Sequence, residues 1–201
     1  MADLPFAPAN LELAGRLLGS LDVEEKVPRA IEALGPLAGR DVILLGGGPV
    51  RVRQLEVLGA RVTSIADWTG RIEQPDDSAD VVVSYWSGFR SANADELHEA
   101  NRVLRHAGRL LVVHDYGRDD VSRLRGDLPE YGSWSRRDGW FLKNGFRIRV
   151  VHCFWTFETM EATTTFLLEV FGSVGAAVVA TLKRPRLSYN VAIYHRTKGG
   201  G

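Results

Sequence analysis

Hydrophobic positions along the chain form two patterns, short continuous apolar runs and apolar residues at helical spacing. Short apolar runs bounded by glycine or polar residues are typical of buried strands, and the helical spacing is typical of helices that cover a sheet. The runs predict strands over residues 42–45, 61–66, 80–84, 109–114, 146–155 and 187–196. The helical spacing predicts helices over residues 10–19, 27–34, 50–58, 93–105, 135–144 and 159–182.

Capping residues mark the ends of several predicted helices. Asn10 precedes the first helix, and Asn93 stands three residues before Glu96, which is the spacing of a capping box. Gly108 is predicted to close the helix over 93–105, and Ser135 to open the helix over 135–144. Strands that alternate with helices indicate an α/β fold, a doubly wound and mostly parallel sheet with N-terminal helices.

Ligands of such sheets bind at the carboxyl ends of the strands, near the point where the strand order reverses. Four segments of this chain are expected at that edge: 46–50, 67–68, 85–89 and 114–120. The first holds Gly46, Gly47 and Gly48 between a buried strand and a helix. Glycines let the backbone approach a ligand closely, and the start of the next helix favours an anionic group. No Gly-Lys-Ser/Thr follows, which argues against a phosphate-binding loop of NTPases.

Composition bounds the class of protein. The 201 residues are 45% hydrophobic and 25% charged, which is typical of a soluble globular protein. We expect one domain over 1–201, with N-terminal helices to residue 38, an α/β core over 39–196 and a tail over 197–201. Cys153 is the only cysteine, so the chain forms no internal disulfide and no multi-cysteine zinc site. No metal site is expected, and the absence of a signal-like N-terminus predicts a cytoplasmic location.

Charge is unevenly distributed although the net charge is zero. Residues 1–100 carry 9 Lys/Arg and 16 Asp/Glu, a net −7, and residues 101–201 carry 16 and 9, a net +7. Two interpretations stay open: the halves attract each other within one fold, or the second half offers a basic face to an anionic partner. The basic residues are scattered, which makes nucleic-acid binding the less favoured prediction.

The most membrane-like segment is 166–182. It has 17 residues and contains Glu169, whereas a spanning helix needs about 20 predominantly apolar residues. We therefore predict a buried or oligomer-facing helix with no membrane contact, and a possible homodimer through helix 159–182.

Three blocks in this order resemble the class I S-adenosylmethionine-dependent methyltransferases, of the kind called type 11. They are the glycine loop in 42–50, the second strand with its terminal acid in 59–67, and the strand, helix and strand over 75–113. Gly145-Phe146 and the closing segment 189–194 fit the C-terminal half of that family, so the resemblance covers roughly residues 36–196.

The resemblance implies a cofactor, S-adenosylmethionine, and methyl transfer to a small-molecule substrate. Gly46, Gly47 and Gly48 would lie against the amino-acid end of the cofactor, and Asp67 would accept hydrogen bonds from the ribose hydroxyls. Trp68 and Tyr85 would stack on the adenine, and Trp86 and Tyr116 would border the substrate. His114 or Asp115 would act as the general base.

The chain departs from the family's pattern at ligand-facing positions. Leu44 stands where the family has an acid, Val50 where it has its last loop glycine, and Ala66 where it has the strand-two acid. Residues 67–79 are too few for the helix and strand that the family places there, so we predict a sheet that lacks one βα unit. These departures keep an alternative function open, a catalytically inactive binding or assembly module.

Overall fold

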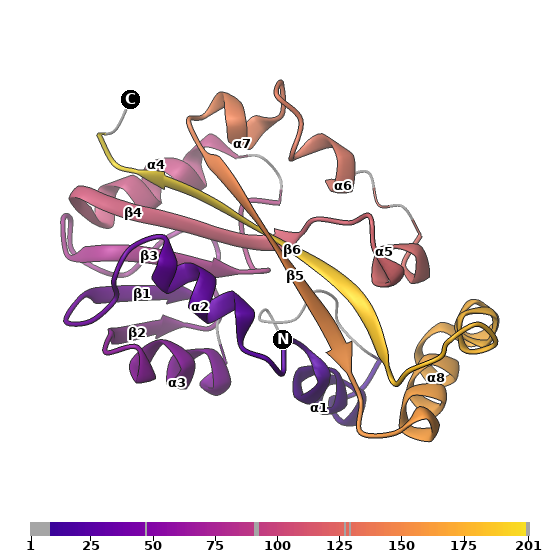
Figure 1. Cartoon of the computed structure of the whole chain (residues 1–201). Helices are drawn as coiled ribbons and strands as arrows, with labels where there is room; N and C mark the ends of the chain where they lie inside the picture. Colours follow the sequence, from indigo (N-terminus) through magenta and orange to yellow (C-terminus); the bar gives the residue numbers. More distant parts are fainter. Residues whose placement is uncertain (1–8, 47, 91–92, 127, 129, 200–201) are drawn as a thin grey trace.

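The computed structural model describes residues 9–46, 48–90, 93–126, 128 and 130–199. In this part of the chain six strands form one sheet in the order β2-β1-β3-β4-β6-β5 (Figure 1). Their bounds are β1 Asp41–Leu45, β2 Arg61–Ile65, β3 Ala79–Tyr85, β4 Leu104–Asp115, β5 Arg147–Thr156 and β6 Arg186–Thr197. All six predicted strands are confirmed.

The sheet is mostly parallel, as predicted. β1 pairs in parallel with β2 and β3, and β3 with β4, whereas β6 is antiparallel to both of its neighbours. The chain leaves β1 toward β2 and then returns to the other side of β1 for β3, so the strand order reverses between β1 and β3. Residues 66–78 form no helix or strand, which confirms the missing βα unit.

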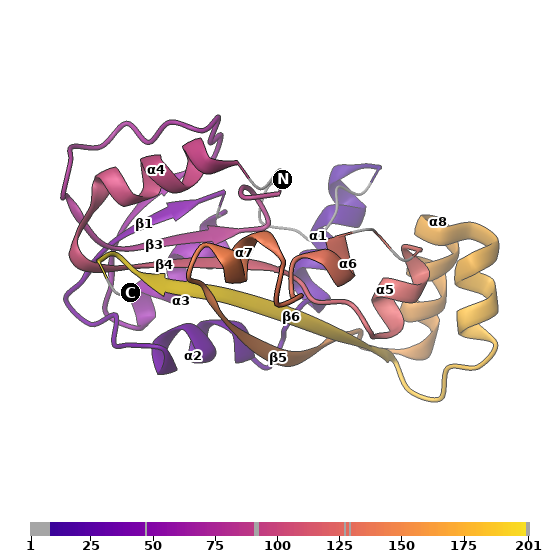
Figure 2. The ribbon, with the colours of Figure 1, turned by 90° about the horizontal axis from the view of Figure 1, so that it is seen from above.

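Both faces of the sheet are apolar because successive strand side chains point to opposite sides. Val42 and Leu44 contribute to one buried cluster, and Ile43 and Leu45 to the other. Helices cover both faces (Figure 2). The first face packs against α1 Leu11–Ser20, α2 Lys26–Ala33, α3 Pro49–Val57, α5 Asp120–Leu124 and α8 Met160–Val179; the second packs against α4 Ala94–Val103 and α7 Trp140–Lys143.

Both asparagine N-caps that the sequence predicts are present, whereas several later helix ends differ. Asn93 caps α4 by accepting from the Asp95 amide at 2.9 Å, but Glu96 accepts from the Phe89 amide and completes no capping box. Asn10 caps α1, its Oδ1 accepting from the Leu13 amide at 2.9 Å. Gly108 does not close a helix, because α4 ends at Val103 and β4 begins at the next residue. The helix predicted over 135–144 is reduced to the four residues of α7, and two short helices, α5 and α6 Glu130–Ser133, were not predicted.

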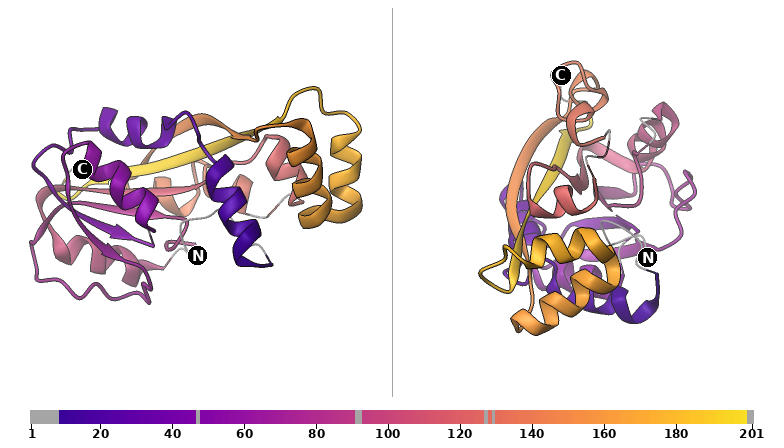
Figure 3. Two further views of the ribbon diagram at one scale, coloured as in Figure 1. Left: turned by 90° about the horizontal axis from the view of Figure 1, so that it is seen from below. Right: turned by 90° about the vertical axis from the view of Figure 1, so that its right-hand side faces the viewer.

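Helix α8 is broken at Gly172, whose φ of 53° and ψ of −125° are not helical. The two arms lie side by side at one end of the molecule (Figure 3). By length and composition α8 could cross a membrane, and 22% of its most apolar window is buried within the molecule. The single helix predicted over 159–182 is therefore a helical hairpin.

Ion pairs connect the acidic first half of the chain to the basic second half. Arg105 contacts Asp41 at 2.9 Å and Asp80 at 3.1 Å, and Lys198 contacts Asp77 at 2.8 Å. These contacts favour the interpretation in which the two halves attract each other within one fold.

Candidate functional site at the carboxyl ends of the strands

The glycine loop follows β1 at the reversal point of the strand order. Gly46 turns the chain with φ 74°, and its amide donates to the Ile65 carbonyl at 2.8 Å. Gly48 is the N-cap of α3, and no side chain caps this helix. Gly47 lies outside the described residues. The loop thus ties β1 to β2 and leads directly into the start of a helix, which is a favourable place for an anion.

Two of the departures in this loop have structural explanations. Val50 needs no positive φ, because α3 has already begun at Pro49. Leu44 is 0% exposed and packs in the core beneath α3. The backbone of the loop is therefore compatible with its sequence, while the position of the family's acid carries no charge.

Arg51, in the first turn of α3, is buried beside this loop with 2% exposure. Its guanidinium lies 5.3 Å from the ring centroid of Tyr85 and 5.9 Å from that of Trp86. Sequence reasoning missed Arg51. Its spacing of four from the buried Leu55 was the available signal, since residues four apart share a helix face.

The second loop follows β2, which ends at Ile65. Asp67 is therefore outside the strand, and strand alternation does not dictate its direction. Its carboxylate is exposed and has no hydrogen-bond or ion-pair partner among the described residues. A free carboxylate at this edge is available to a ligand's hydroxyl groups.

Trp68 connects the second loop to the loop that follows β3. Its indole packs on Gly88, where an added Cβ would lie 1.8 Å from the ring, and its ring centroid is 5.4 Å from that of Phe89. Because β1 lies between β2 and β3, Trp68 reaches across the end of β1. Its buried Nε1 has no hydrogen-bond partner among the residues that the structure describes.

Tyr85 and Trp86 end β3 and are both buried, at 0% and 4% exposure. Burial raises the pKa of Tyr85, whose hydroxyl has no hydrogen-bond partner within the described ranges. Trp86 has φ 48°, an uncommon conformation for a bulky residue, and its Nε1 donates to Asp115 at 2.8 Å. The next residue, Ser87, donates its hydroxyl to the Leu45 carbonyl at 2.9 Å, which holds the β3 loop against the glycine loop.

Asp115, at the end of β4, is the centre of a buried polar cluster. Its carboxylate accepts hydrogen bonds from Trp86, Tyr189 and Tyr131 and forms an ion pair with Arg125. These contacts join β3, β4, β6 and the segments after β4. A carboxylate with this many donors is well suited to fix the Trp86 ring in place.

His114 lies on the opposite face of the sheet from Asp115, because adjacent strand residues alternate. It is 0% exposed and packs against the rings of Trp134 and Phe141. Its Nε2 is 2.8 Å from the Gly88 carbonyl and donates to it, which leaves Nδ1 without a partner. Burial, and secondarily Arg90, lowers the pKa of His114 to about 3, so the ring is neutral at pH 7.

Tyr116 follows Asp115 and is half-buried. Its amide donates to the Asn190 carbonyl at 2.9 Å, and the Arg118 guanidinium lies 5.7 Å from its ring centroid. The structure therefore groups the glycine loop, Asp67, Trp68 and the β3 loop around the ends of β1 and β3. It places Tyr116 on the β6 side, whereas His114 contacts the β3 loop through the Gly88 carbonyl, on the sheet face that also carries Trp68 and Phe89.

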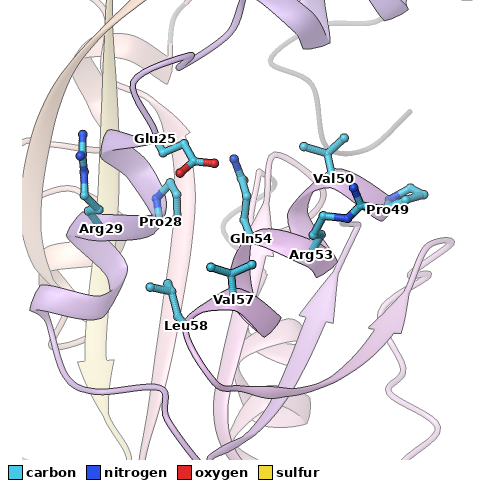
Figure 4. A pocket seen from close by; sticks show the side chains of 9 residues that line it. All are labelled: Glu25, Pro28, Arg29, Pro49, Val50, Arg53, Gln54, Val57 and Leu58. Atoms are coloured by element: carbon cyan, nitrogen blue, oxygen red, sulfur yellow. The ribbon is translucent and has the colours of Figure 1, made fainter.

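A separate groove of about 360 Å³ runs between α2 and α3 (Figure 4). Side chains of the two helices face each other across it, with Glu25 opposite Gln54. Only Pro49 and Val50 among its lining residues border the glycine loop. The groove is thus a feature of the helical layer, apart from the strand ends.

Comparisons with known proteins agree with this topology. No profile of a protein family and no curated protein sequence matches the chain. Solved structures do: a SAM-dependent methyltransferase from Aquifex aeolicus is 14% identical, with TM-score 0.53, over 92% of this chain and 98% of that one. A protein described as a methyltransferase of an antibiotic biosynthesis pathway from Anabaena variabilis is 13% identical, with TM-score 0.56, over 89% and 99%. A protein described as a type II methyltransferase from Anaeromyxobacter dehalogenans is 16% identical, with TM-score 0.52, over 85% and 96%.

The likeness extends over nearly the whole of each chain. Because the sequence identities are low, these comparisons establish the fold alone. The chain has the Rossmann-like fold of the class I S-adenosylmethionine-dependent methyltransferases.

Proposed function

We propose that the protein binds S-adenosylmethionine at the ends of β1 and β3 and transfers its methyl group to a small molecule. The observation that supports this most is a set of groups left without partners at that edge of a methyltransferase fold. In the part of the chain that the structure describes, Asp67 has a free carboxylate, Trp68 has an unpaired Nε1, and α3 begins without a side-chain cap. Such groups suit a ligand with a ribose, an aromatic base and an amino-acid end.

Each group has a definite part in this proposal. Asp67 would accept from the ribose hydroxyls, Trp68 and Phe89 would border the adenine, and Gly46 and Gly48 would give the amino-acid end access to the backbone. The bound cofactor would supply an electrophilic methyl group on a sulfonium. The chain would contribute positioning and the exclusion of water.

The predicted general bases, His114 and Asp115, enter this proposal as positioning residues. His114 is neutral, but its free Nδ1 faces a buried aromatic environment, and Asp115 is occupied by its four neighbours. Both residues instead fix neighbouring groups by hydrogen bonds: Asp115 accepts from the Trp86 ring, and His114 donates to the Gly88 carbonyl. Methyl transfer to an acceptor that is already deprotonated requires no base.

Calorimetric titration of S-adenosylmethionine and S-adenosylhomocysteine tests the proposal. Asp67→Ala removes hydrogen bonds to two hydroxyls, about 1.5–3 kcal/mol, so we expect affinity to fall about 10- to 150-fold. Glu73→Ala, an exposed acid in the same connection, is the matched control and should leave affinity unchanged. An unchanged affinity in Asp67→Ala would contradict the ribose assignment.

A second candidate function is a methyltransferase-like binding or assembly module without catalysis. The ion pair of Asp115 with Arg125 and the burial of His114 favour this function, because neither predicted base is accessible to a methyl acceptor. The same titration separates the two functions. No binding of either ligand at millimolar concentration would contradict the enzyme and favour the module.

A further inference from the structure

Arg51 has an unsatisfied positive charge beside the glycine loop. Its side chain is buried, with 2% exposure, and Nη1 donates to the Gln54 amide oxygen at 2.9 Å. Among the described residues, Nε has no hydrogen-bond partner and no carboxylate lies within ion-pair distance of the guanidinium. Buried arginines normally pair with an anion, because an uncompensated buried charge is strongly unfavourable.

The aromatic rings of Tyr85 and Trp86 offset part of this cost through cation–π contacts. They provide no hydrogen-bond acceptor for Nε, so the guanidinium keeps its capacity to bind an anion. Arg binds carboxylates particularly well, because its planar donors match the two carboxylate oxygens.

The position of Arg51 indicates which anion it would meet. It stands in the first turn of α3, directly after the loop that ends β1, and above the residues that end β3. Ser87 joins the β3 loop to the end of β1 through the Leu45 carbonyl, and the Arg51 guanidinium lies over the Tyr85 and Trp86 rings at the start of that loop. The uncapped start of α3 adds its own partial positive charge to the same place.

Leu44 stands at a position beside the loop where the resemblance predicts an acidic residue. Its side chain is buried in the apolar core and contributes no negative charge to the loop. At the start of α3 a buried cation thus stands beside a neutral residue, while the carboxylate of Asp67 belongs to the loop that follows β2. This arrangement favours an anionic ligand end beside Arg51.

We infer that Arg51 binds the carboxylate of the ligand's amino-acid end, and that the site recognises this end by its carboxylate rather than by its ammonium group. This inference rests on the proposed function and adds a specificity to it. The site would then require a carboxylate on the bound ligand, independently of the identity of the methyl acceptor.

Three ligands test the inference by calorimetry: S-adenosylhomocysteine, its deaminated analogue and its decarboxylated analogue. We expect the wild-type protein to bind the first two within about threefold and the decarboxylated analogue at least tenfold more weakly. Arg51→Met should weaken the two carboxylate ligands at least tenfold and bring all three to similar affinity. Arg53→Met, on the exposed side of the same helix, is the control and should retain the wild-type order.

The outcomes separate this inference from the proposed function. Equal binding of S-adenosylhomocysteine and the decarboxylated analogue by the wild type would overturn the role of Arg51 and leave the proposed function standing. A strong loss with the deaminated analogue would overturn the preference for the carboxylate over the ammonium. Binding of none of the three ligands would overturn both proposals.

Folding is checked separately, because Arg51 also packs on two aromatic rings. If Arg51→Met unfolds, Arg51→Lys replaces it: lysine retains the charge without the planar donors, so the carboxylate preference should shrink but persist. A variant that loses affinity for all three ligands by the same factor would indicate a structural role only, and would overturn the inference.

Discussion

His114 shows how one buried titratable residue can make stability depend on pH. Its pKa in the folded protein is about 3, far below the ordinary value of 6.5, because burial disfavours the charged ring. Above pH 6.5 the ring is neutral in both the folded and unfolded states and adds no pH dependence. As pH falls from 6.5 toward 3, the unfolded chain binds the proton first, so stability is lost over that range.

We therefore predict that His114→Gln flattens the acid side of the stability profile. The loss attributable to His114 is at most about 1.4 kcal/mol per pH unit, or about 2–3 kcal/mol at pH 4.5. Glutamine does not titrate and retains a donor for the Gly88 carbonyl. Urea unfolding at several pH values measures the effect, and His98→Gln, at an exposed position of α4, is the control. Identical slopes in wild type and His114→Gln would refute the assignment.

Individual site residues could be predicted from the sequence only where they lie next to a recognisable pattern, such as the end of an apolar run. The glycines and Asp67 were found because they end apolar runs. The roles of Arg51 and Asp115 were hidden, because both depend on partners distant in the chain: Tyr85 for the first and Tyr189 for the second. A charged residue also reads as exposed from its type alone, whereas packing places Arg51 in the core.

At the scale of elements, prediction succeeded where a periodic pattern and a cap coincide. The α1 helix has both, and the strands were predicted from their continuous apolar runs alone. The helix expected over 135–144 had weak periodicity, and the chain there instead passes through a turn at Gly139, whose surroundings leave no room for a Cβ. The hairpin in α8 was missed because Gly172 sits within an otherwise helical pattern, where glycine alone does not signal a break.

Two glycine-to-alanine substitutions test the break in α8. Gly172 has a backbone conformation that alanine adopts poorly, so Gly172→Ala should destabilise the protein by about 1–3 kcal/mol. Gly15 lies inside α1 with no atom near its Cβ position, so Gly15→Ala should stabilise by about 0.5–1 kcal/mol. The same chemical change thus has opposite signs, measured as free energies of unfolding in urea. A stabilising Gly172→Ala would mean that α8 is a continuous helix in solution.

At the scale of the whole molecule, charge and apolar surface are arranged in different places. The opposite net charges of the two halves of the sequence sum to zero, and some of these charges meet in ion pairs such as those of Arg105. The hairpin of α8 projects from one end of the molecule, and residues 170–182 contain no charged side chain. Little electrostatic repulsion therefore opposes contact between two copies through this end.

We propose that α8 joins two copies of the chain. Leu168 and Val174 are 44% and 49% exposed, and a second hairpin related by a two-fold axis would cover the same residues in both copies. Size-exclusion chromatography with light scattering should give twice the 22.2 kDa mass of one chain, and Val174→Glu should shift the protein toward the monomer because it buries a charge in the interface. Val57→Glu, on the exposed side of α3 at 80% exposure, is the control for adding a charge elsewhere and should leave the dimer intact. A wild-type protein that is monomeric throughout the micromolar range, or that requires detergent to stay in solution, would contradict the dimer and assign the apolar hairpin to another surface.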